Sequence, residues 1–378
     1  MSATDPTMMR VGDVPSPAEA SPASDRASRR AALEEAVLPP VVALLVAAVV
    51  GDLLILSFGQ SPGAVYRLLL EGTWGNAYGF GQVLYKATTL VFTGLAVGVG
   101  LRAGLFNIGA ESQLAAGGFC AALAGLALPS GLPWLVCLPL YLVAAAAGGG
   151  VVGAIPGVLK ARFGAHEVIV TIMLNFVVLA LLGYLTSAHL HVPETLHTPP
   201  IRSGALPRVA GVLPAFHGSA ANATLVLAIV TAAALGWLLF RTRRGFELRA
   251  VGLQPRAAEY AGVSVARITW QALTLSGAIA GLGGLNFVLG YKQYYEEGFA
   301  TGAGFLGIAV ALVGRSHPFG ITVAALLFAT LSQGGLAVNA LVPKQMVDVL
   351  QAVVILAVAT SVPEVRRLLR GATRSAER

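Results

Sequence analysis

The sequence predicts an all-α protein that crosses a membrane many times, and two observations support this. Of the 378 residues, 56% are hydrophobic and only 11% are charged, with a mean hydropathy of +0.75. Soluble proteins contain about a quarter charged residues. The apolar residues also gather in runs of roughly the 20 residues that a helix needs to cross the hydrocarbon core. Because a helix satisfies its own backbone polar groups in lipid, each run is expected to be helical.

The N-terminal residues 1–36 precede the first apolar run and are rich in Ala, Ser, Pro and charge. Such a composition buries too little apolar surface to fold, so this segment is expected to be a disordered cytoplasmic tail. The first apolar run is longer than the h-region of a signal peptide, and no clear small-residue cleavage site follows it. A cleaved leader is therefore not expected.

Ten membrane spans are expected from the apolar runs. Their approximate bounds are 37–58, 80–100, 103–128, 132–159, 167–190, 222–240, 268–290, 302–314, 318–341 and 345–362. An amphipathic piece at 62–76 and a polar outer segment at 191–221 lie between spans. The transmembrane domain is expected to cover residues 37–365, and residues 366–378 a cytoplasmic C-terminal tail.

The distribution of Lys and Arg predicts the orientation. With the N-terminus inside, 19 of the 25 basic residues fall on the cytoplasmic side or in the cytoplasmic tails. The opposite orientation would invert this ratio, against the tendency of Lys and Arg to remain in cytoplasmic loops. Both termini are therefore expected in the cytoplasm. The net charge of +7 is explained by this orientation and does not indicate nucleic-acid binding.

Two interrupted segments indicate an internal repeat. Residues 101–118, LRAGLFNIGAESQLAAGG, open with a polar stretch broken by glycine, and residues 301–314 are too few to cross the membrane upright. Each is the second segment of a five-segment block, 80–190 and 268–362. Because five is odd, the second block is expected to have inverted topology. Interrupted helices at matching places in inverted halves point to a substrate pathway between the halves.

Two clusters of polar residues lie in apolar surroundings and are the candidate pathway residues. They are Phe106, Asn107, Glu111 and Gln113 in the first cluster and Glu167, Thr171 and Asn175 in the second. The three residues of the second cluster follow one another at intervals of four, so they share one helix face. Polar groups at membrane depth are costly and usually face a cavity or a partner. The aromatic ring can stack on a substrate ring while the amides bond to it; the alternative is that these groups only tie helices together.

The interval 241–267, RTRRGFELRAVGLQPRAAEYAGVSVAR, is the longest positively charged stretch between two apolar blocks. Its excess of Arg places it in the cytoplasm. Gly252 is expected to break the chain, Pro255 suits the first position of a short helix, and Gly262 suits the C′ position.

This short helix is expected to dock onto a cytoplasmic partner. Ala257, Ala258 and Ala261 give it a face of small residues, and Arg256 and Glu259 are available for polar contacts. The alternative is a solvated connector whose arginines only fix the topology.

No cofactor, metal site or enzyme activity is expected. Cys120 and Cys137 lie in apolar segments, where cysteine is usually a small core residue. The three histidines at 189, 191 and 197 have no accompanying carboxylate pattern. No lysine is followed by Ser or Thr, so the phosphate-binding loop of an ATPase is absent. No HExxH motif or close catalytic carboxylate pair is present.

Four motifs together carry a family resemblance. They are GLFNIGAESQ (104–113), HEVIVTIMLN (166–175), RAVGLQPRAAEYAGV (249–263) and GFLGIAVALVGRSHPFG (304–320). In this order they resemble the permease subunit of bacterial ABC importers for nucleosides, simple sugars and branched-chain amino acids, most closely the nucleoside permeases. The resemblance covers residues 37–365. Ser112 stands where the family usually has Gly, and Gln254 where it usually has Asn.

The resemblance implies a multi-pass protein of the bacterial plasma membrane with several partners. These are an ABC ATPase subunit, an extracytoplasmic substrate-binding (lipo)protein and a second permease subunit, either a paralogue or another copy of this chain. It also implies that Gly252–Gly262 is the coupling helix that docks into the ATPase.

A second hypothesis is an ion-coupled secondary transporter that uses Glu111 or Asp348. Inverted repeats with broken helices fit this reading equally well. A secondary carrier needs no docking helix, and its uptake would survive ATP depletion while the ion gradient lasts. The polar residues suit a nucleoside, yet similar polarity would suit a pentose.

Overall fold

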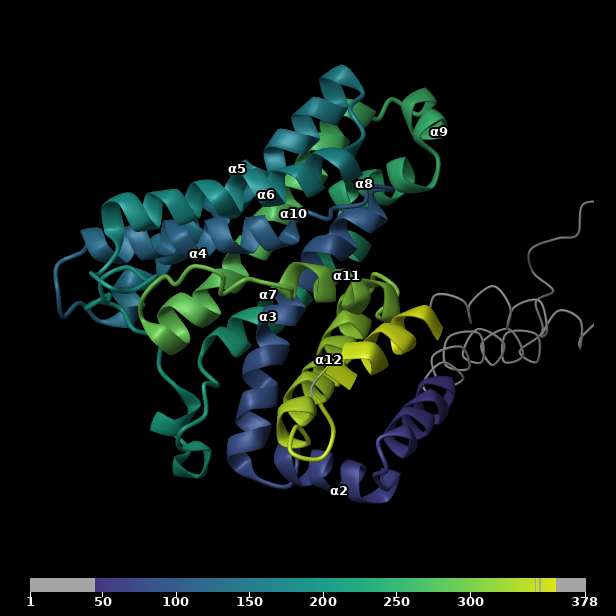
Figure 1. Ribbon diagram of the computed structural model, residues 1–378. Coiled ribbons are helices and arrows are strands. Elements are labelled where there is room, and N and C mark those ends of the chain that lie inside the picture. The colour runs from purple at the N-terminus through teal and green to yellow at the C-terminus, as the bar shows by residue number, and fades with distance from the viewer. Residues whose placement is uncertain (1–44, 344, 347, 358–378) are drawn as a thin grey trace, which may run out of the picture.

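The structure, a computed structural model, describes residues 45–343, 345–346 and 348–357, and this part of the chain is a bundle of helices (Figure 1). Among the residues that the structure describes, six helical segments are long and apolar enough to cross a membrane. A seventh results if the helices Leu45–Ser57 and Pro62–Thr73, bent by 110° at their break, count as one span. The chain is therefore a multi-pass α-helical membrane protein. The count of ten spans and the orientation stay predictions, and both tails lie outside the described residues.

The helices of the bundle have the following bounds. They are α2 (Pro62–Thr73), α3 (Ala77–Arg102), α4 (Ala110–Ala127), α5 (Trp134–Phe163), α6 (Glu167–Leu185), α7 (Thr224–Arg241), α8 (Arg243–Leu253), α9 (Pro255–Tyr260), α10 (Val265–Phe287), α11 (Ala303–Val313) and α12 (Pro318–Ala337). One π-helical turn, η1 (Thr186–Leu190), extends α6, and another, η4 (Val288–Lys292), extends α10.

Both interruptions expected from the sequence are present. The chain leaves α3 at Arg102 and does not become helical again until Ala110. After η4, residues 293–302 are not helical, and α11 has only 11 residues. Each interrupted segment therefore begins with irregular backbone and continues as a helix, of 18 residues in α4 and 11 residues in α11.

Helix α10 lies at the centre of the bundle and packs against α3, α4 and α5. It meets α5 through glycines: a Cβ at Gly277 would overlap the Gly149 carbonyl, and one at Gly281 would overlap the Ala145 carbonyl. Gly277 and Gly281 are four residues apart, as are Gly149 and Gly153, which is the spacing that lets helices approach closely in membranes. This close contact fixes the position of α10 and of the irregular segment that follows it.

The outer polar segment lies along the chain that leaves α10. Thr198 N donates to Tyr295 O at 2.9 Å, and Ile201 N donates to Gln293 O at 2.7 Å. Isolated antiparallel bridging between His197 and Glu296 continues this pairing. The pairing holds residues 293–297 in place without a helix.

The loop 241–267 contains two helices, where one was expected. Gly252 does not break the chain, so that prediction is wrong: it lies inside α8, and the break is at Gln254, with φ −153° and ψ 90°. Glycine is needed at 252 because a Cβ there would overlap the Arg102 carbonyl oxygen. Pro255 begins α9 as expected, and Gly262 follows its C-cap with φ +83°.

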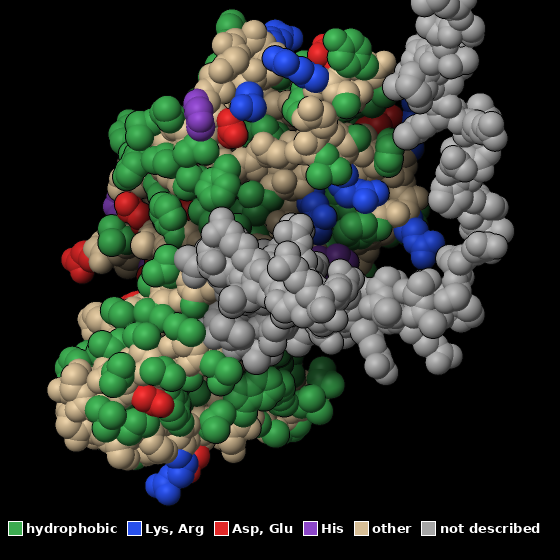
Figure 2. All heavy atoms as spheres, turned by 90° about the vertical axis from the view of Figure 1, so that its right-hand side faces the viewer, with side chains coloured by type: hydrophobic (Ala, Val, Ile, Leu, Met, Phe, Trp, Pro, Cys, Tyr) green, Lys and Arg blue, Asp and Glu red, His purple; other side chains and the backbone are tan. Residues whose placement is uncertain are grey.

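The surface shown in Figure 2 separates apolar and basic regions. Most of the Lys and Arg side chains visible there lie in the upper half, at the height of α8 and α9 in Figure 1, and hydrophobic side chains cover much of the lower part. A basic end beside an apolar belt is typical of a membrane protein with that end in the cytoplasm.

Candidate functional site

The two interrupted segments meet at Glu111, in the first turn of α4. Its carboxylate accepts a hydrogen bond from Gly302 N at 3.0 Å, and the backbone amide of Gly304 also bonds to it. Glycine at 304 allows the contact, because a Cβ there would overlap the Glu111 backbone. The N-termini of α4 and α11 therefore both face one carboxylate, where their positive helix ends stabilise negative charge.

Asn107 binds the irregular segment before α4 to α10. Its Nδ2 donates to Gln113 Oε1 at 2.8 Å and to Ser276 Oγ at 2.7 Å, and its Oδ1 accepts from Gly109 N at 2.9 Å. Ser276 was not among the predicted site residues, because nothing in its local sequence distinguishes it from an ordinary small residue.

The second predicted cluster lies directly beside the first. Asn175 of α6 accepts from Ser112 N at 3.1 Å and donates from Nδ2 to Ile108 O at 2.9 Å. Ile108 N in turn donates to Thr171 Oγ1 at 3.3 Å. The two clusters thus form one network, in which side chains of α6 satisfy backbone groups that the broken helix leaves open.

Glu167 completes this network at the start of α6. Its carboxylate lies 2.6 Å from Lys160 Nζ and also bonds to the backbone amide of Phe106. The Phe106 side chain is half-buried. The polar side chains of both predicted clusters therefore bond to the protein itself, as the helix-tying alternative requires.

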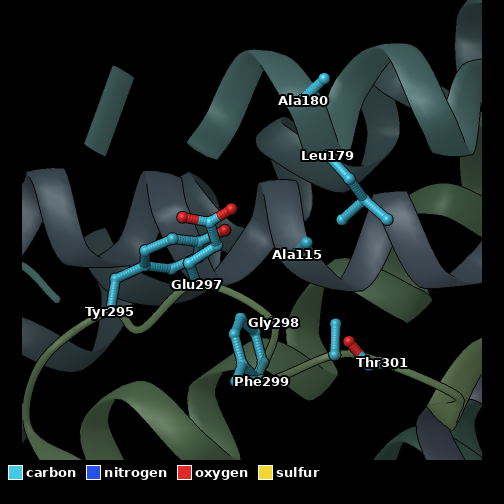
Figure 3. A pocket seen from close by; sticks show the side chains of 9 residues that line it. Ala115, Leu179, Ala180, Tyr295, Glu297, Gly298, Phe299 and Thr301 are labelled. Atoms are coloured by element: carbon cyan, nitrogen blue, oxygen red, sulfur yellow. The ribbon is translucent and has the colours of Figure 1, made fainter. Parts of the chain in front are cut away.

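A cavity of about 270 Å³ lies next to this network (Figure 3). Its walls come from α4, α6 and the irregular segment before α11. The lining residues are Ala115, Leu179, Ala180, Tyr295, Glu297, Gly298, Phe299, Ala300 and Thr301. Sequence reasoning missed this site, although the aromatic and acidic run YKQYYEEGF at 291–299 between two apolar stretches was a visible signal.

The small residues predicted to form one face of α9 differ in their exposure. Ala257 and Ala261 are exposed, together with Pro255, Arg256, Glu259 and Gly262. Ala258 is only 5% exposed and belongs to the hydrophobic core of the permease. It therefore cannot be the central contact for a partner in this conformation.

Two large apolar side chains project from the same loop. Leu253, the last residue of α8, is 85% exposed, and Tyr260, the last residue of α9, is 94% exposed, although both lie in the most basic part of the chain. Exposed apolar side chains rimmed by polar residues mark interaction sites. These two residues were not among those predicted from the sequence.

Arg102 joins this loop to the membrane core. Its Nε donates to Ser316 O at 2.9 Å and its Nη2 to Arg315 O at 3.2 Å, in the turn between α11 and α12. Arg315 and Ser316 have φ of 53° and 51°, which non-glycine residues rarely adopt. The Arg102 guanidinium also lies 5.5 Å from the centre of the Phe240 ring. The guanidinium of Arg249, on α8, lies 5.3 Å from the same ring centre.

Comparison with known proteins identifies a family and several relatives of this chain. The family described as branched-chain amino acid transport system / permease component matches residues 79–359. The guanosine ABC transporter permease protein NupP of Bacillus subtilis is 38% identical over 332 residues, which cover 86% of this chain and 93% of that protein.

Two further relatives have similar coverage. The nucleoside ABC transporter permease protein NupB of Lactococcus lactis is 34% identical, over 85% of this chain and 90% of its own length. The glucose ABC transporter permease protein TsgB13 of Haloferax volcanii is also 34% identical, over 85% of this chain and 87% of its own length. No solved structure matches. The chain therefore belongs to the family of ABC-transporter permeases described as the permease component of branched-chain amino acid transport systems.

Proposed function

We propose that this permease subunit imports a nucleoside across the bacterial plasma membrane, driven by ATP hydrolysis in a partner chain. The observation that carries the proposal is the 38% identity to a guanosine permease along 93% of that protein's length. A simple sugar is the second candidate substrate, because a glucose permease is 34% identical over a similar share of the chain.

Three partners complete the importer that we propose. They are an ABC ATPase, an extracytoplasmic substrate-binding (lipo)protein and a second permease subunit. Support for the ATPase comes from the loop of α8 and α9, where Leu253 and Tyr260 are exposed next to a basic surface. Ala257 and Ala261 lie on the same outer side of α9, so a groove on the ATPase can approach its backbone closely.

The proposed pathway runs between two inverted halves, with both termini in the cytoplasm. The contact of Glu111 with Gly302 supports this arrangement, because it brings the N-termini of α4 and α11 together. Half-helices that meet in this way occur at the substrate sites of transporters built from inverted repeats. Residues of the Asn107 and Asn175 network hold this junction, and the Phe106 side chain is available beside it.

Uptake by cells that lack their own nucleoside importers tests the proposal. Cells that express this permease together with its ATPase, binding protein and second permease subunit are expected to accumulate radiolabelled guanosine, and glucose to a smaller extent. Depleting ATP while an ion gradient is maintained is expected to stop uptake. Uptake that persists under that condition would favour the ion-coupled transporter, and uptake of neither compound would refute the proposed substrate class.

A further inference from the structure

We propose that the cavity beside Glu297 is where this permease contacts its substrate, and that the site takes an uncharged nucleoside. In this site the base stacks on the aromatic wall, and its N–H groups or the sugar hydroxyls donate to the Glu297 carboxylate. The inference deepens the proposed import function and rests on it.

The first support is the irregular backbone at the site. Residues 293–302 leave the end of a membrane-length helix and return to the centre of the bundle, where Gly302 meets Glu111. The opposite wall, at Leu179 and Ala180, belongs to the span Glu167–Leu190. Residues 293–297 pair with the outer polar segment, and the chain then continues past the cavity to Gly302 at Glu111. The irregular backbone therefore runs from the outer end of the bundle toward its centre along the cavity wall.

The second support is the Glu297 carboxylate itself. Within residues 45–357, as far as they are described, neither an ion pair nor a hydrogen bond engages it. It lies close to α6 at Gly183, where an added Cβ would come within 2.7 Å of Glu297 Oε1. Glu297 is exposed and lines the cavity, so its carboxylate is placed to accept hydrogen bonds from a substrate. By contrast, Glu111 and Glu167 both have protein partners.

Contacts between rings hold the aromatic wall of the cavity. Phe299 stacks on Phe287 with ring centres 4.8 Å apart and an interplanar angle of 21°, and its edge contact with Tyr295 is 5.5 Å at 83°. Tyr295 is fixed in turn by an edge contact with Phe119 at 5.2 Å. Rings that are already ordered lose little conformational freedom when a planar base stacks on them.

The geometry of the cavity suits a small ring compound. Figure 3 shows Glu297 and Thr301 on either side of Phe299, with Leu179 and Ala180 above them. The volume of about 270 Å³ is just below the roughly 300 Å³ at which ligand sites begin, so the cavity limits the substrate to a small compound. Ala115 and Ala180 leave this room because their side chains are short.

The chemistry of the walls selects among related compounds. A carboxylate accepts hydrogen bonds from N–H and O–H groups and repels anions. A base with an N–H edge, such as guanine, provides two adjacent donors. A nucleoside is therefore expected to enter and a nucleoside phosphate to be excluded. A sugar without an aromatic ring would use only part of the wall.

The test is guanosine uptake by the complete transporter carrying Glu297→Gln, with Glu296→Gln as the matched control on the neighbouring residue. We expect Glu297→Gln to lower guanosine uptake at least tenfold, with the ATPase still co-purifying and the melting temperature unchanged. Phe299→Ala is expected to raise the KM for guanosine, and Glu296→Gln to leave uptake within twofold of wild type. Uptake by Glu297→Gln within twofold of wild type, or an equal loss in both Gln variants, would overturn the site.

A second measurement applies if Glu297→Gln does not assemble. Thr301→Cys in the otherwise native chain is labelled with a thiol reagent in membranes, and the unmodified chain gives the background from Cys120 and Cys137. Guanosine is expected to slow this labelling, and guanosine monophosphate is not. Labelling that guanosine does not change would refute the site. If the wild-type transporter takes up no nucleoside, the proposed function itself fails, which is a separate outcome.

Discussion

The Glu111 carboxylate and the Gly302 backbone amide, 191 positions apart in the sequence, are joined by a hydrogen bond of 3.0 Å. This bond links the first turn of α4 to the residue before α11. It joins the two interrupted segments. It also places one carboxylate at the N-termini of two helices, where the partial positive charge of the helix ends stabilises it.

Replacing Glu111 tests that junction. Glu111→Ala leaves the partly buried Gly302 amide without its acceptor, and a fully buried unsatisfied donor would cost about 1–3 kcal/mol. The variant is expected to melt at a lower temperature in detergent. Glu111→Gln keeps an acceptor oxygen, so its melting temperature is expected to fall less. Glu71→Gln, in an exposed pair with Arg67, is the control. A wild-type melting curve for Glu111→Ala would show that the junction contributes no stability.

Asn107→Leu separates a structural role from a role in the pathway. The substitution removes the bonds to Gln113 and Ser276, and an interhelical bond in a membrane contributes roughly 0.6–2 kcal/mol. We expect less folded protein in detergent, measured by size-exclusion chromatography and thermal melting. A variant that folds and assembles normally but does not transport would instead place Asn107 on the substrate path.

The exposed side of the α8–α9 loop is expected to bind the ATPase. Leu253→Asp puts a charge where an apolar side chain is 85% exposed, so it is expected to leave the permease folded. ATPase recovered per permease by pull-down should fall at least tenfold, and uptake should stop. Arg243→Gln is the control, because that side chain is 91% exposed and its salt-bridge partner among the described residues, Glu247, is on the same helix. Full ATPase recovery with Leu253→Asp would make the loop a plain connector.

Ala258→Trp is expected to act on the permease itself. Ala258 is buried in the permease core, and inserting a large side chain into a packed core costs about 1–3 kcal/mol or more. The expected result is a lower yield of folded permease, whereas Ala261→Trp on the exposed side should fold and lose the ATPase. Comparison of both variants by fluorescence-detected chromatography and pull-down decides this. Equal yields of folded protein, with ATPase lost only from Ala258→Trp, would contradict the inward position of Ala258.

Arg102 is expected to couple the loop to α11. Arg102→Gln cannot make both hydrogen bonds to the 315–316 turn and loses the contact with Phe240. Uptake should fall about tenfold or more, while ATPase recovery stays near wild type. Arg102→Lys keeps the charge but not the planar two-donor geometry, so its uptake is expected to stay nearly as low as that of Arg102→Gln. Recovery of full uptake by Lys would show that charge alone matters.

The sequence by itself determined the class, the family and the local breaks in the chain. Hydropathy and charge bias are properties of residues that are close in the sequence. So are the start of α9 at Pro255 and its end before Gly262. These features can therefore be recognised from the sequence alone. The polar clusters at 107–113 and 167–175 were recognisable for the same reason, because polarity stands out within an apolar run. So were the interruptions before α4 and α11, since glycine and short apolar length act locally.

Only the tertiary structure decided what these residues contact. Asn107 bonds to Ser276, 169 positions away, and Glu297 lies against Gly183 of α6. Gly252, read as a chain break, is a packing glycine beneath Arg102, and Ala258, read as a docking residue, is buried. Such contacts depend on how glycine-rich helices approach and rotate against one another. That arrangement is set by the packing of the whole bundle, which no single stretch of sequence encodes.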